Sequence, residues 1–391
     1  MRHFLTLERI IMKKIVIIGA NDFQKPLIQK AKEMGYETHV FAWREGATGA
    51  EDADFFYEIS IVEMDAILEE CRKIKPDAVA TIGSDLANIT VQYLAEKLGL
   101  PGNSRECICC STNKYAMRQA MKAAGVSVPY FQVTDGKETE KITVPSYPVI
   151  VKPTDRSGSR AITRVERHED LQEAVRNAID QSFEKKAIIE EYLSGQEYSM
   201  EAISYEGTHT CLAVTKKFTT GDPHYIEIGH LQPAPLEPEL KEKIIKEIFR
   251  ALDALKIRNG ASHSEFRVDE KGKVHIIEIG SRMGGDCIGS HLVPLSTGQD
   301  FVKMVVQTAA GEKPELNCRP LQKCSAIRFI MDQKDLETLK HIEEKYPQNV
   351  VEKVLEGQPG THPVTDSSSR FGFYIFQTDT VEETEQMQLW K

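Results

Sequence analysis

The sequence has no run of apolar residues that approaches the ~20 needed to cross a bilayer. Residues 1–14 carry too short and too broken an apolar stretch for a secretory signal. Met12 lies just before the first predicted strand, so residues 1–11 are expected to be an extension of little structural weight. No long basic run is present, and 59 acidic against 49 basic residues give a net charge of −10. We therefore expect a cytoplasmic protein that has neither a membrane nor a nucleic acid as its partner.

Several signatures of enzyme chemistry are missing as well. Gly19 stands alone where a dinucleotide fingerprint requires G-x-G-x-x-G, and no Walker loop, H-E-x-x-H or G-x-S-x-G occurs. The eight cysteines include a group at 107–110, but no second C-x-x-C or histidine pair stands at zinc spacing, so reduced thiols are expected. His224, His230 and His263 are not at metal-ligand spacing either, and each is more typical of a solvated loop or a satisfied partner. A nicotinamide-linked enzyme is left as a weak alternative.

The N-terminal part of the chain contains a β-loop-α-β unit. With 41% hydrophobic and 28% charged residues, the 391-residue chain is ordinary for a globular protein of two or three domains. Apolar runs at Ile15–Ile18 and Thr38–Ala42 flank a helical stretch at Lys25–Met34, which predicts a doubly wound parallel sheet. A further buried strand, Asp77–Ile82, leads into the polar residues 83–85. These either bind a ligand at the end of the sheet or cap a helix.

The middle of the chain has features suited to anions. A helix is predicted over Ser111–Ala124. The apolar strand Pro148–Pro153 contains Lys152, whose charge is costly there unless a phosphate meets it or its end reaches water. The polar Gly/Ser loop Thr154–Arg160 is of a kind that presents backbone N–H groups to anions. A long loop is predicted over Lys217–Pro235, and loops of that length are commonly functional or mobile.

The stretch Ser262–Gly285 predicts two strands joined by a polar turn centred between Lys271 and Gly272. In a hairpin of that register, Glu265 and Glu278 lie opposite each other with Cβ atoms roughly 5 Å apart. Two carboxylates that close repel, so one takes a proton or a cation sits between them. A hard divalent ion such as Mg²⁺, completed by waters and phosphates, meets this requirement. A register shifted by one residue would instead turn one glutamate to solvent.

Arg282 follows the second glutamate and stands beside Gly284 and Gly285. Glycines allow the backbone to come near a ligand. The Arg282 guanidinium could then hold a carboxylate or phosphoryl oxygen with two hydrogen bonds. The alternative is an ordinary surface ion pair.

Five stretches in this order resemble the ATP-grasp superfamily of carboxylate–amine ligases of the amino-acid-ligase type. They are residues 111–129, 148–162, 188–203, 217–236 and 263–286. The chain is similar also to the carbamoyl-phosphate synthase large subunit and to glycinamide ribonucleotide transformylase-type proteins. The resemblance implies an α/β and α+β architecture in three parts: an N-terminal doubly wound parallel-sheet domain at 1–110, an ATP-grasp domain of two α+β subdomains at 111–317 with a smaller lid at about 125–192, and a small C-terminal α/β subdomain at 318–391.

The resemblance also implies roles for individual residues, of which Arg282 and Lys152 are catalytic. ATP would be bound by Lys114, Lys152, Ser157, Gly158, Ser159, Glu190, Glu191, Tyr192, Leu193 and Glu197; the metal by Glu265 and Glu278; the substrates by Glu227, His230 and Arg282. Residues 190–193 would line the adenine, and Glu197 would bind the ribose hydroxyls. Two positions depart from the family pattern. Asn113 stands where Asp is usual and is expected to serve as a helix cap. Gly280 stands where Asn is common, which leaves the number of metal ions open.

The activity implied by the resemblance is formation of an amide or peptide bond from a small-molecule carboxylate and an amine, through an acyl-phosphate. ATP and Mg²⁺ are the implied cofactors, with Mn²⁺ as a substitute, and a homodimer is left open. Two further alternatives remain. One is another ATP-grasp reaction, of the phosphoribosyl-amine or carbamoyl-phosphate type. The other is a nucleotide-binding protein without catalysis.

Overall fold

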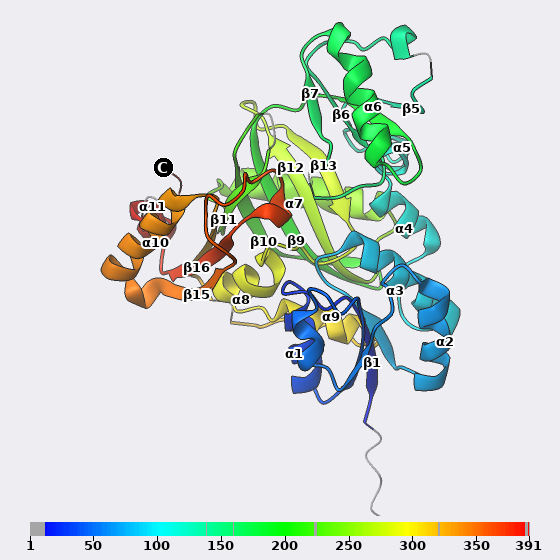
Figure 1. The fold of residues 1–391 in the computed structure, drawn as a ribbon, viewed down its shortest axis with the longest axis vertical. Helices are drawn as coiled ribbons and strands as arrows, with labels where there is room; N and C mark the ends of the chain where they lie inside the picture. Colours follow the sequence, from blue (N-terminus) through cyan, green and yellow to red (C-terminus); the bar gives the residue numbers. More distant parts are fainter. Residues whose placement is uncertain are drawn as a thin grey trace, which may run out of the picture.

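The N-terminal domain is a parallel sheet covered by helices, as the β-loop-α-β pattern predicted. The computed structural model describes residues 12–137, 139–158, 160–222, 225–319, 321–387 and 390. The sheet has the order β3-β2-β1-β4. Its elements are β1 (Lys14–Ile18), α1 (Lys25–Glu33), β2 (Glu37–Phe41), β3 (Phe55–Tyr57), α2 (Met64–Ile74), β4 (Ala78–Ala80) and α3 (Asp85–Leu98). In Figure 1 this domain lies at the bottom of the view.

The helix predicted over Ser111–Ala124 is two helices that meet at Asn113. Helix α4 (Arg105–Thr112) ends there and α5 (Lys114–Ala123) begins, so the expected start at Ser111 was wrong. The Asn113 side chain accepts hydrogen bonds from the backbone N–H groups of Tyr115 and Ala116, which confirms its role as a cap.

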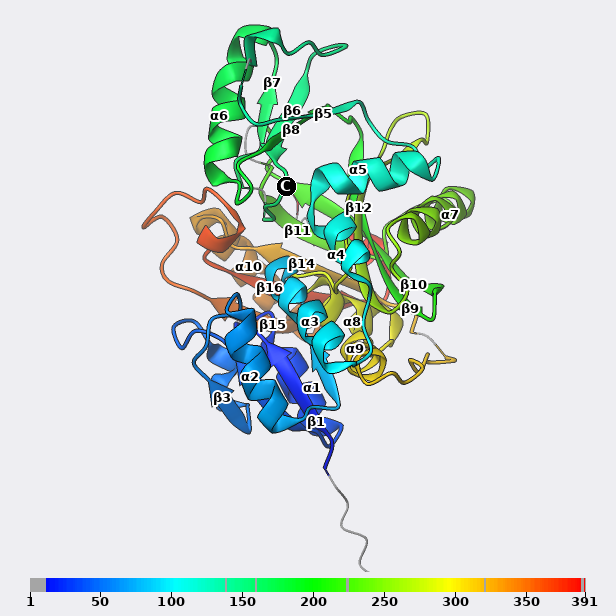
Figure 2. The ribbon, with the colours of Figure 1, turned by 90° about the vertical axis from the view of Figure 1, so that its right-hand side faces the viewer.

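The lid has a four-stranded antiparallel sheet of its own, in the order β5-β8-β6-β7. Its elements are β5 (Phe131–Thr134), β6 (Val149–Pro153), β7 (Thr163–Val165), α6 (Leu171–Gln181) and β8 (Ala187–Glu191). Both views show this sheet and α6 standing away from the N-terminal domain, with the central sheet between them (Figures 1 and 2).

The central sheet has eight strands in the order β13-β12-β9-β10-β11-β14-β16-β15. Its elements are β9 (Gln196–Tyr205), β10 (Thr208–Thr219), β11 (Glu227–Gln232), α7 (Pro238–Ala254), β12 (Gly260–Val268), β13 (Val274–Gly280), α8 (Val293–Thr297), α9 (Phe301–Ala309), β14 (Cys324–Phe329), α10 (Gln333–Lys345), β15 (Val350–Leu355), β16 (Gly372–Thr378) and α11 (Val381–Gln386). Strands β14 to β16 therefore extend the same sheet. The domain division at residues 110 and 317 stays a prediction.

The long loop predicted over Lys217–Pro235 was wrong over about half of its length. Strand β10 continues to Thr219, and β11 begins at Glu227. Strand β11 pairs with β10 on one side and with β14 on the other. Lys217, Glu227 and His230 are consequently fixed on a sheet.

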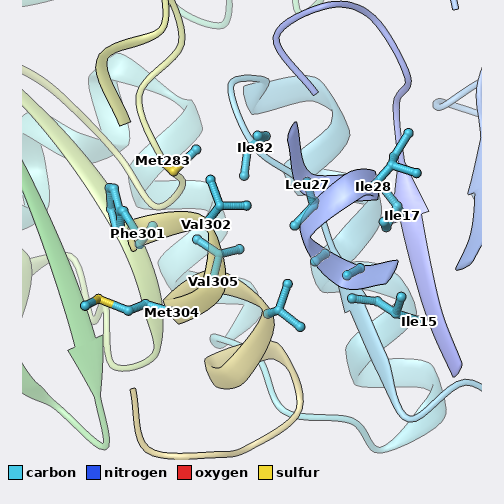
Figure 3. Packing of buried hydrophobic residues seen from close by; sticks show 14 of the residues in the cluster. Ile15, Ile17, Leu27, Ile28, Ile82, Met283, Phe301, Val302, Met304 and Val305 are labelled. Atoms are coloured by element: carbon cyan, nitrogen blue, oxygen red, sulfur yellow. The ribbon is translucent and has the colours of Figure 1, made fainter. Parts of the chain in front are cut away.

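An apolar core joins the N-terminal domain to the central sheet through helix α9. Ile15, Ile17 and Leu27 of the N-terminal domain lie on one side of this core, and Phe301 and Met304 of α9 lie on the other (Figure 3). The cluster also contains Met283, from the segment that follows β13, and Ala261 of β12. Because burial of apolar area stabilises this contact, the loop after β4 is held against the end of the β12–β13 hairpin. None of the helices in the described parts of the chain is long and apolar enough to cross a membrane.

Candidate functional site

A pocket lies where the lid, the central sheet and the N-terminal domain meet. Thirteen of the residues predicted for the site line it: Lys114, Lys152, Ser157, Gly158, Glu190, Glu191, Tyr192, Leu193, Glu197, Glu227, Glu265, Glu278 and Arg282. His230 lies on strand β11, as Glu227 does, but is not among the lining residues. Ser159 is outside the described residues. The lining also includes Asp85, one of the residues expected either to bind a ligand or to cap a helix, and Arg118, which the sequence did not indicate.

The two glutamates of the hairpin are paired across β12 and β13, as predicted. Glu265 lies opposite Glu278, and the alternative register is wrong. The pairing near the turn is Val268 with Val274 and Phe266 with Ile276, and a bulge then follows between Glu265 and Phe266. The bulge adds one residue to β13, which brings both carboxylates to the same face of the sheet.

Cationic side chains already meet these two carboxylates. The Lys114 Nζ donates to Glu278 Oε1 over 3.1 Å, and Lys217 Nζ donates to Glu265. Buried Lys217 also stands 3.5 Å from Glu197 and 3.5 Å from Glu227. Burial alone would raise the pKa of Glu265, but Lys217 and its other neighbours hold it well below the usual range. Sequence reasoning missed Lys217 because it was assigned to a loop.

The donor chemistry fits a divalent ion that a nucleotide helps to hold. Glu265 and Glu278 are each about one-quarter exposed and line the same pocket. Within the described ranges, no group of three or more His, Cys, Asp or Glu side chains is placed to bind a metal. Gly280, opposite His263 in the ladder, adds no ligand. An ion at this site would therefore depend on phosphate and water oxygens for the rest of its coordination.

A buried ion triad joins Lys152 and Glu190, on strands β6 and β8 of the lid, to Arg118 of helix α5. Glu190 accepts hydrogen bonds from Arg118 Nε at 2.5 Å and pairs with Lys152 Nζ at 2.7 Å. Burial would raise the pKa of Glu190, but Arg118 and Lys152 lower it to about 2. The alternative in which the end of the Lys152 side chain reaches water is therefore wrong. A carboxylate meets its charge instead. Burial nevertheless lowers the pKa of Lys152, so a further anion beside it would stabilise its charge.

The residues expected to hold the adenine divide into two groups. The side chain of Glu190 faces the triad, so it is not free to contact a base. Tyr192 stands 4.5 Å from the Arg164 guanidinium, which lies over its ring, and the Leu193 carbonyl accepts from Arg267 Nη1 at 2.7 Å. Arg267 also donates to Glu197 at 3.1 Å, which orients the carboxylate predicted for the ribose.

Arg282 is held by Asp85 of the N-terminal domain. Its Nε and Nη2 donate to the two carboxylate oxygens of Asp85 at 2.8 and 2.9 Å. Ser84 caps helix α3, so the capping alternative was correct for that residue. Burial would raise the pKa of Asp85, but Arg282 holds it below the usual range. A Cβ at Gly280 would stand 3.1 Å from Asp85 Oδ1, so glycine leaves room for this pair.

We expect Asp85→Asn to slow turnover while sparing nucleotide affinity. The amide cannot balance the Arg282 charge, and the guanidinium would shift within the pocket. A misplacement near 1 Å can cost up to about 100-fold in rate. The measurement is the rate of ADP release together with the Kd for ATP. Asp65→Asn, in the first turn of α2, is the matched control. Equal rates in the two variants would contradict a role for Asp85.

His263 connects the hairpin to the interior of the sheet. It pairs through Nδ1 with the buried Glu201, and its Nε2 lies 3.3 Å from Glu265 Oε1. Burial opposes its charge, but the two carboxylates raise the pKa of His263 to about 9. The Gly284 backbone N–H donates to Glu201 Oε2 at 3.0 Å. Of the two expectations for His263, the satisfied partner is confirmed and the solvated loop residue is wrong.

Gly284→Ala should destabilise the chain by about 1–3 kcal/mol, the usual cost of overpacking. The new Cβ would stand 2.7 Å from His263 Nδ1 and 2.8 Å from Glu201 Oε1. Gly285→Ala is the control, because its Cβ would meet nothing closer than 3.7 Å. The measurement is the free energy of unfolding of both variants, which should fall more for Gly284→Ala than for Gly285→Ala. A larger loss for Gly285→Ala would show that this packing argument is wrong.

Glu227 and His230, predicted for the substrates, lie on one strand but in different settings. Glu227 lines the pocket, while His230 is fully buried behind it. Burial lowers the pKa of His230. Among the described residues, neither of its ring nitrogens has a hydrogen-bond partner, and Nε2 is 3.9 Å from Asp286.

Comparison with known proteins agrees with this arrangement. Residues 145–290 match the family model described as the ATP-grasp domain. A protein of Sinorhizobium fredii called "Uncharacterized protein y4rH" is 27% identical over 285 residues, which cover 70% of this chain and 58% of the relative. The D-alanine–D-alanine ligase of Trichlorobacter lovleyi is 26% identical over 228 residues, 56% of this chain and 72% of the ligase. The match therefore spans little more than half of the first relative's own length.

The architecture also has a counterpart among solved structures. The L-amino acid ligase from Bacillus licheniformis superposes with a TM-score of 0.81 at 24% identity, covering 96% of this chain and 95% of that one. This likeness shows the fold. With the matched family model, it leads to one conclusion: residues 145–290 are an ATP-grasp domain, in a chain that is similar in sequence to D-alanine–D-alanine ligases and shares its fold with an L-amino acid ligase.

Proposed function

We propose that the protein is an ATP-dependent carboxylate–amine ligase. The observation that carries the proposal is one pocket lined by the opposed carboxylates Glu265 and Glu278, the lysines Lys114 and Lys152, and Arg282. Carboxylates suit a divalent ion, and lysine and arginine suit phosphoryl oxygens. The metal, when bound by Glu265 and Glu278, would neutralise charge on the phosphates.

The proposed reaction has two steps. An oxygen of the substrate carboxylate attacks the γ-phosphorus of ATP, the bond to the β-phosphate oxygen breaks, and ADP leaves. The amine of the second substrate then attacks the acyl-phosphate carbonyl and loses a proton as phosphate departs. Lys114 and Lys152 would hold phosphate oxygens, and Arg282 would stabilise the negative charge that develops on the acyl group.

Amino acids are the substrates we favour. The relative from Trichlorobacter lovleyi is named for joining two D-alanines, and the superposed structure from Bacillus licheniformis is named an L-amino acid ligase. Both names describe carboxylate–amine ligases that act on amino acids. We also propose a cytoplasmic location, and sedimentation of the purified chain would determine whether it forms a homodimer.

An ADP-release assay tests the proposal. The full chain is incubated with ATP, Mg²⁺ and pools of D- and L-amino acids and small carboxylates, and products are identified by mass spectrometry. We expect ADP, phosphate and a dipeptide or amide in equal amounts with at least one pool. ATP binding without ADP from any pool would contradict the ligase and favour a nucleotide-binding protein without catalysis. Turnover only with bicarbonate or a phosphoribosylamine would favour the other ATP-grasp reactions.

A further inference from the structure

A turn of the C-terminal part of the chain, residues 365–370, contacts the edge of the pocket through Glu227. Ser367 Oγ donates to Glu227 Oε2 over 2.8 Å. Arg370 donates to both carboxylate oxygens of Asp286, with Nη2 at 2.6 Å and Nη1 at 3.0 Å. The turn thus contacts a residue that lines the pocket and a residue that closely follows Arg282 in the chain.

The turn is built to be rigid. The Asp366 carboxylate accepts hydrogen bonds from the backbone N–H groups of Ser368 and Ser369 at 2.8 and 3.1 Å. Arg370 is 8% exposed, its Nε donates to the Ser367 carbonyl at 2.7 Å, and its guanidinium carbon lies 3.6 Å from the centre of the Phe329 ring. A guanidinium held on several sides fixes its carboxylate partner in one place.

The segment that Arg370 holds has an unusual backbone. Asp286 and Cys287 have φ of +50° and +60°, in the left-handed region that non-glycine residues rarely adopt. Such a conformation is strained and persists only where its surroundings hold it. The pair between Arg370 and Asp286 supplies such a restraint.

His230 provides a second, independent sign of function at the same place. It is fully buried, its Nε2 lies 3.9 Å from Asp286, and neither ring nitrogen has a hydrogen-bond partner in the described ranges. Buried polar atoms without partners are rare in proteins and need an explanation, such as a ligand or water. His230 also pairs across the sheet with Lys217, which stands 3.5 Å from Glu227.

We propose that Ser367 and Arg370 are positioning residues of this site, which hold Glu227 and Asp286 where a small-molecule substrate binds. They set the affinity for that substrate and leave the affinity for the nucleotide unchanged. The C-terminal strands then contribute to substrate recognition as well as to the sheet. The inference rests on the proposed function, since it assigns one side of the same pocket to the ligase substrates.

The test compares Arg370→Ala, Arg370→Lys and Ser367→Ala with the wild-type chain. Calorimetry gives the Kd for ADP. The rise in melting temperature with ADP, Mg²⁺ and pools of amino acids reports substrate binding, and steady-state rates give KM for each substrate that turns over. For Arg370→Ala we expect at least a tenfold rise in KM for one amino acid, or loss of its thermal shift, with less than a threefold change in the Kd for ADP. Arg370→Lys keeps the charge and should recover part of the loss. Ser367→Ala should show a smaller rise.

Arg328→Ala is the matched control. Arg328 pairs with Asp335 at 2.6 Å in the same part of the chain. In the β11–β14 ladder Arg328 lies opposite Gly229, and its neighbour Ile327 lies opposite His230. Neighbouring residues of a strand point to opposite faces, so Arg328 points away from the face that carries His230, and neither Arg328 nor Asp335 is among the residues that line the pocket. Equal changes in Arg370→Ala and Arg328→Ala, or an unchanged KM in Arg370→Ala, would overturn the inference. If the wild-type chain binds amino acids but makes no ADP, the ligase proposal fails, while the thermal shifts still decide the role of Arg370.

Discussion

Glu278→Gln should lower the rate of ADP release at least ~100-fold, because the substitution keeps the shape of the side chain but removes a charge. An amide is a poor ligand for a hard divalent ion, and Glu265 alone would hold the metal weakly. The change also removes the partner of Lys114, whose Nζ lies 3.1 Å from Glu278 Oε1. The freed lysine should hold phosphates no less well. We therefore expect ATP to bind while its turnover falls.

The measurement is a titration of Mg²⁺ at saturating ATP, with the amino-acid pool that turns over fastest. Glu278→Gln should need much more Mg²⁺ for half-maximal rate. Glu270→Gln, in the exposed turn of the same hairpin, is the control and should behave as wild type. Unchanged ATP turnover in Glu278→Gln would mean that the hairpin carboxylates do not serve a ligase.

Glu190→Gln should destabilise the protein by roughly 3–5 kcal/mol, the cost of leaving buried charges without their partner. The Arg118 and Glu190 side chains are 1% and 4% exposed, and Lys152 is 6% exposed. Glutamine would leave two neighbouring cations in the interior with no anion. The free energy of unfolding by urea checks the value. Glu69→Gln breaks an ion pair whose side chains are more than half exposed, and it should change stability by less than about 1 kcal/mol. Similar losses in both variants would contradict the triad's importance.

The same residue gives a dependence on pH. The pKa of Glu190 is about 2 in the folded chain, against an ordinary value of 4.5. A carboxyl whose pKa is lowered by folding stabilises the protein above its unfolded pKa, and this stabilisation is lost as the pH falls through the folded pKa. The advantage of wild type over Glu190→Gln should therefore be full above pH 4.5 and shrink as the pH falls toward 2. An advantage that grows on acidification would show that Glu190 is not held as an anion.

Local pattern was enough to find the hairpin. The polar turn at 269–273 predicts two paired strands, and residues that lie opposite each other in such a pair point to the same face. The pairing nevertheless depends on the bulge between Glu265 and Phe266. The residue pairs nearer the turn follow a register that differs by one residue from that of Glu265 and Glu278. No pattern in the hairpin sequence predicts this change.

Strand β11 was predicted to be part of a loop, because its local sequence does not resemble a strand. Its residues, Glu227–Gln232, contain a glycine and a histidine and stand between prolines, which favours a loop. The segment becomes a strand because β10 and β14 offer hydrogen bonds on both sides, and β14 comes almost a hundred residues later. Tertiary pairing overrides the weak local preference. Lys217 was missed for the same reason.

The sequence by itself determined the class of fold, the strand that carries Lys152, and the hairpin that carries Glu265 and Glu278. These follow from periodicity, burial and turn chemistry, which act over a few residues. The tertiary structure decided which charges meet. Arg118 reaches Glu190 across 72 positions of the chain, and Arg282 reaches Asp85 across 197. Such pairs depend on how whole elements pack, because a charge is stabilised by whatever partner the fold brings within a few ångströms.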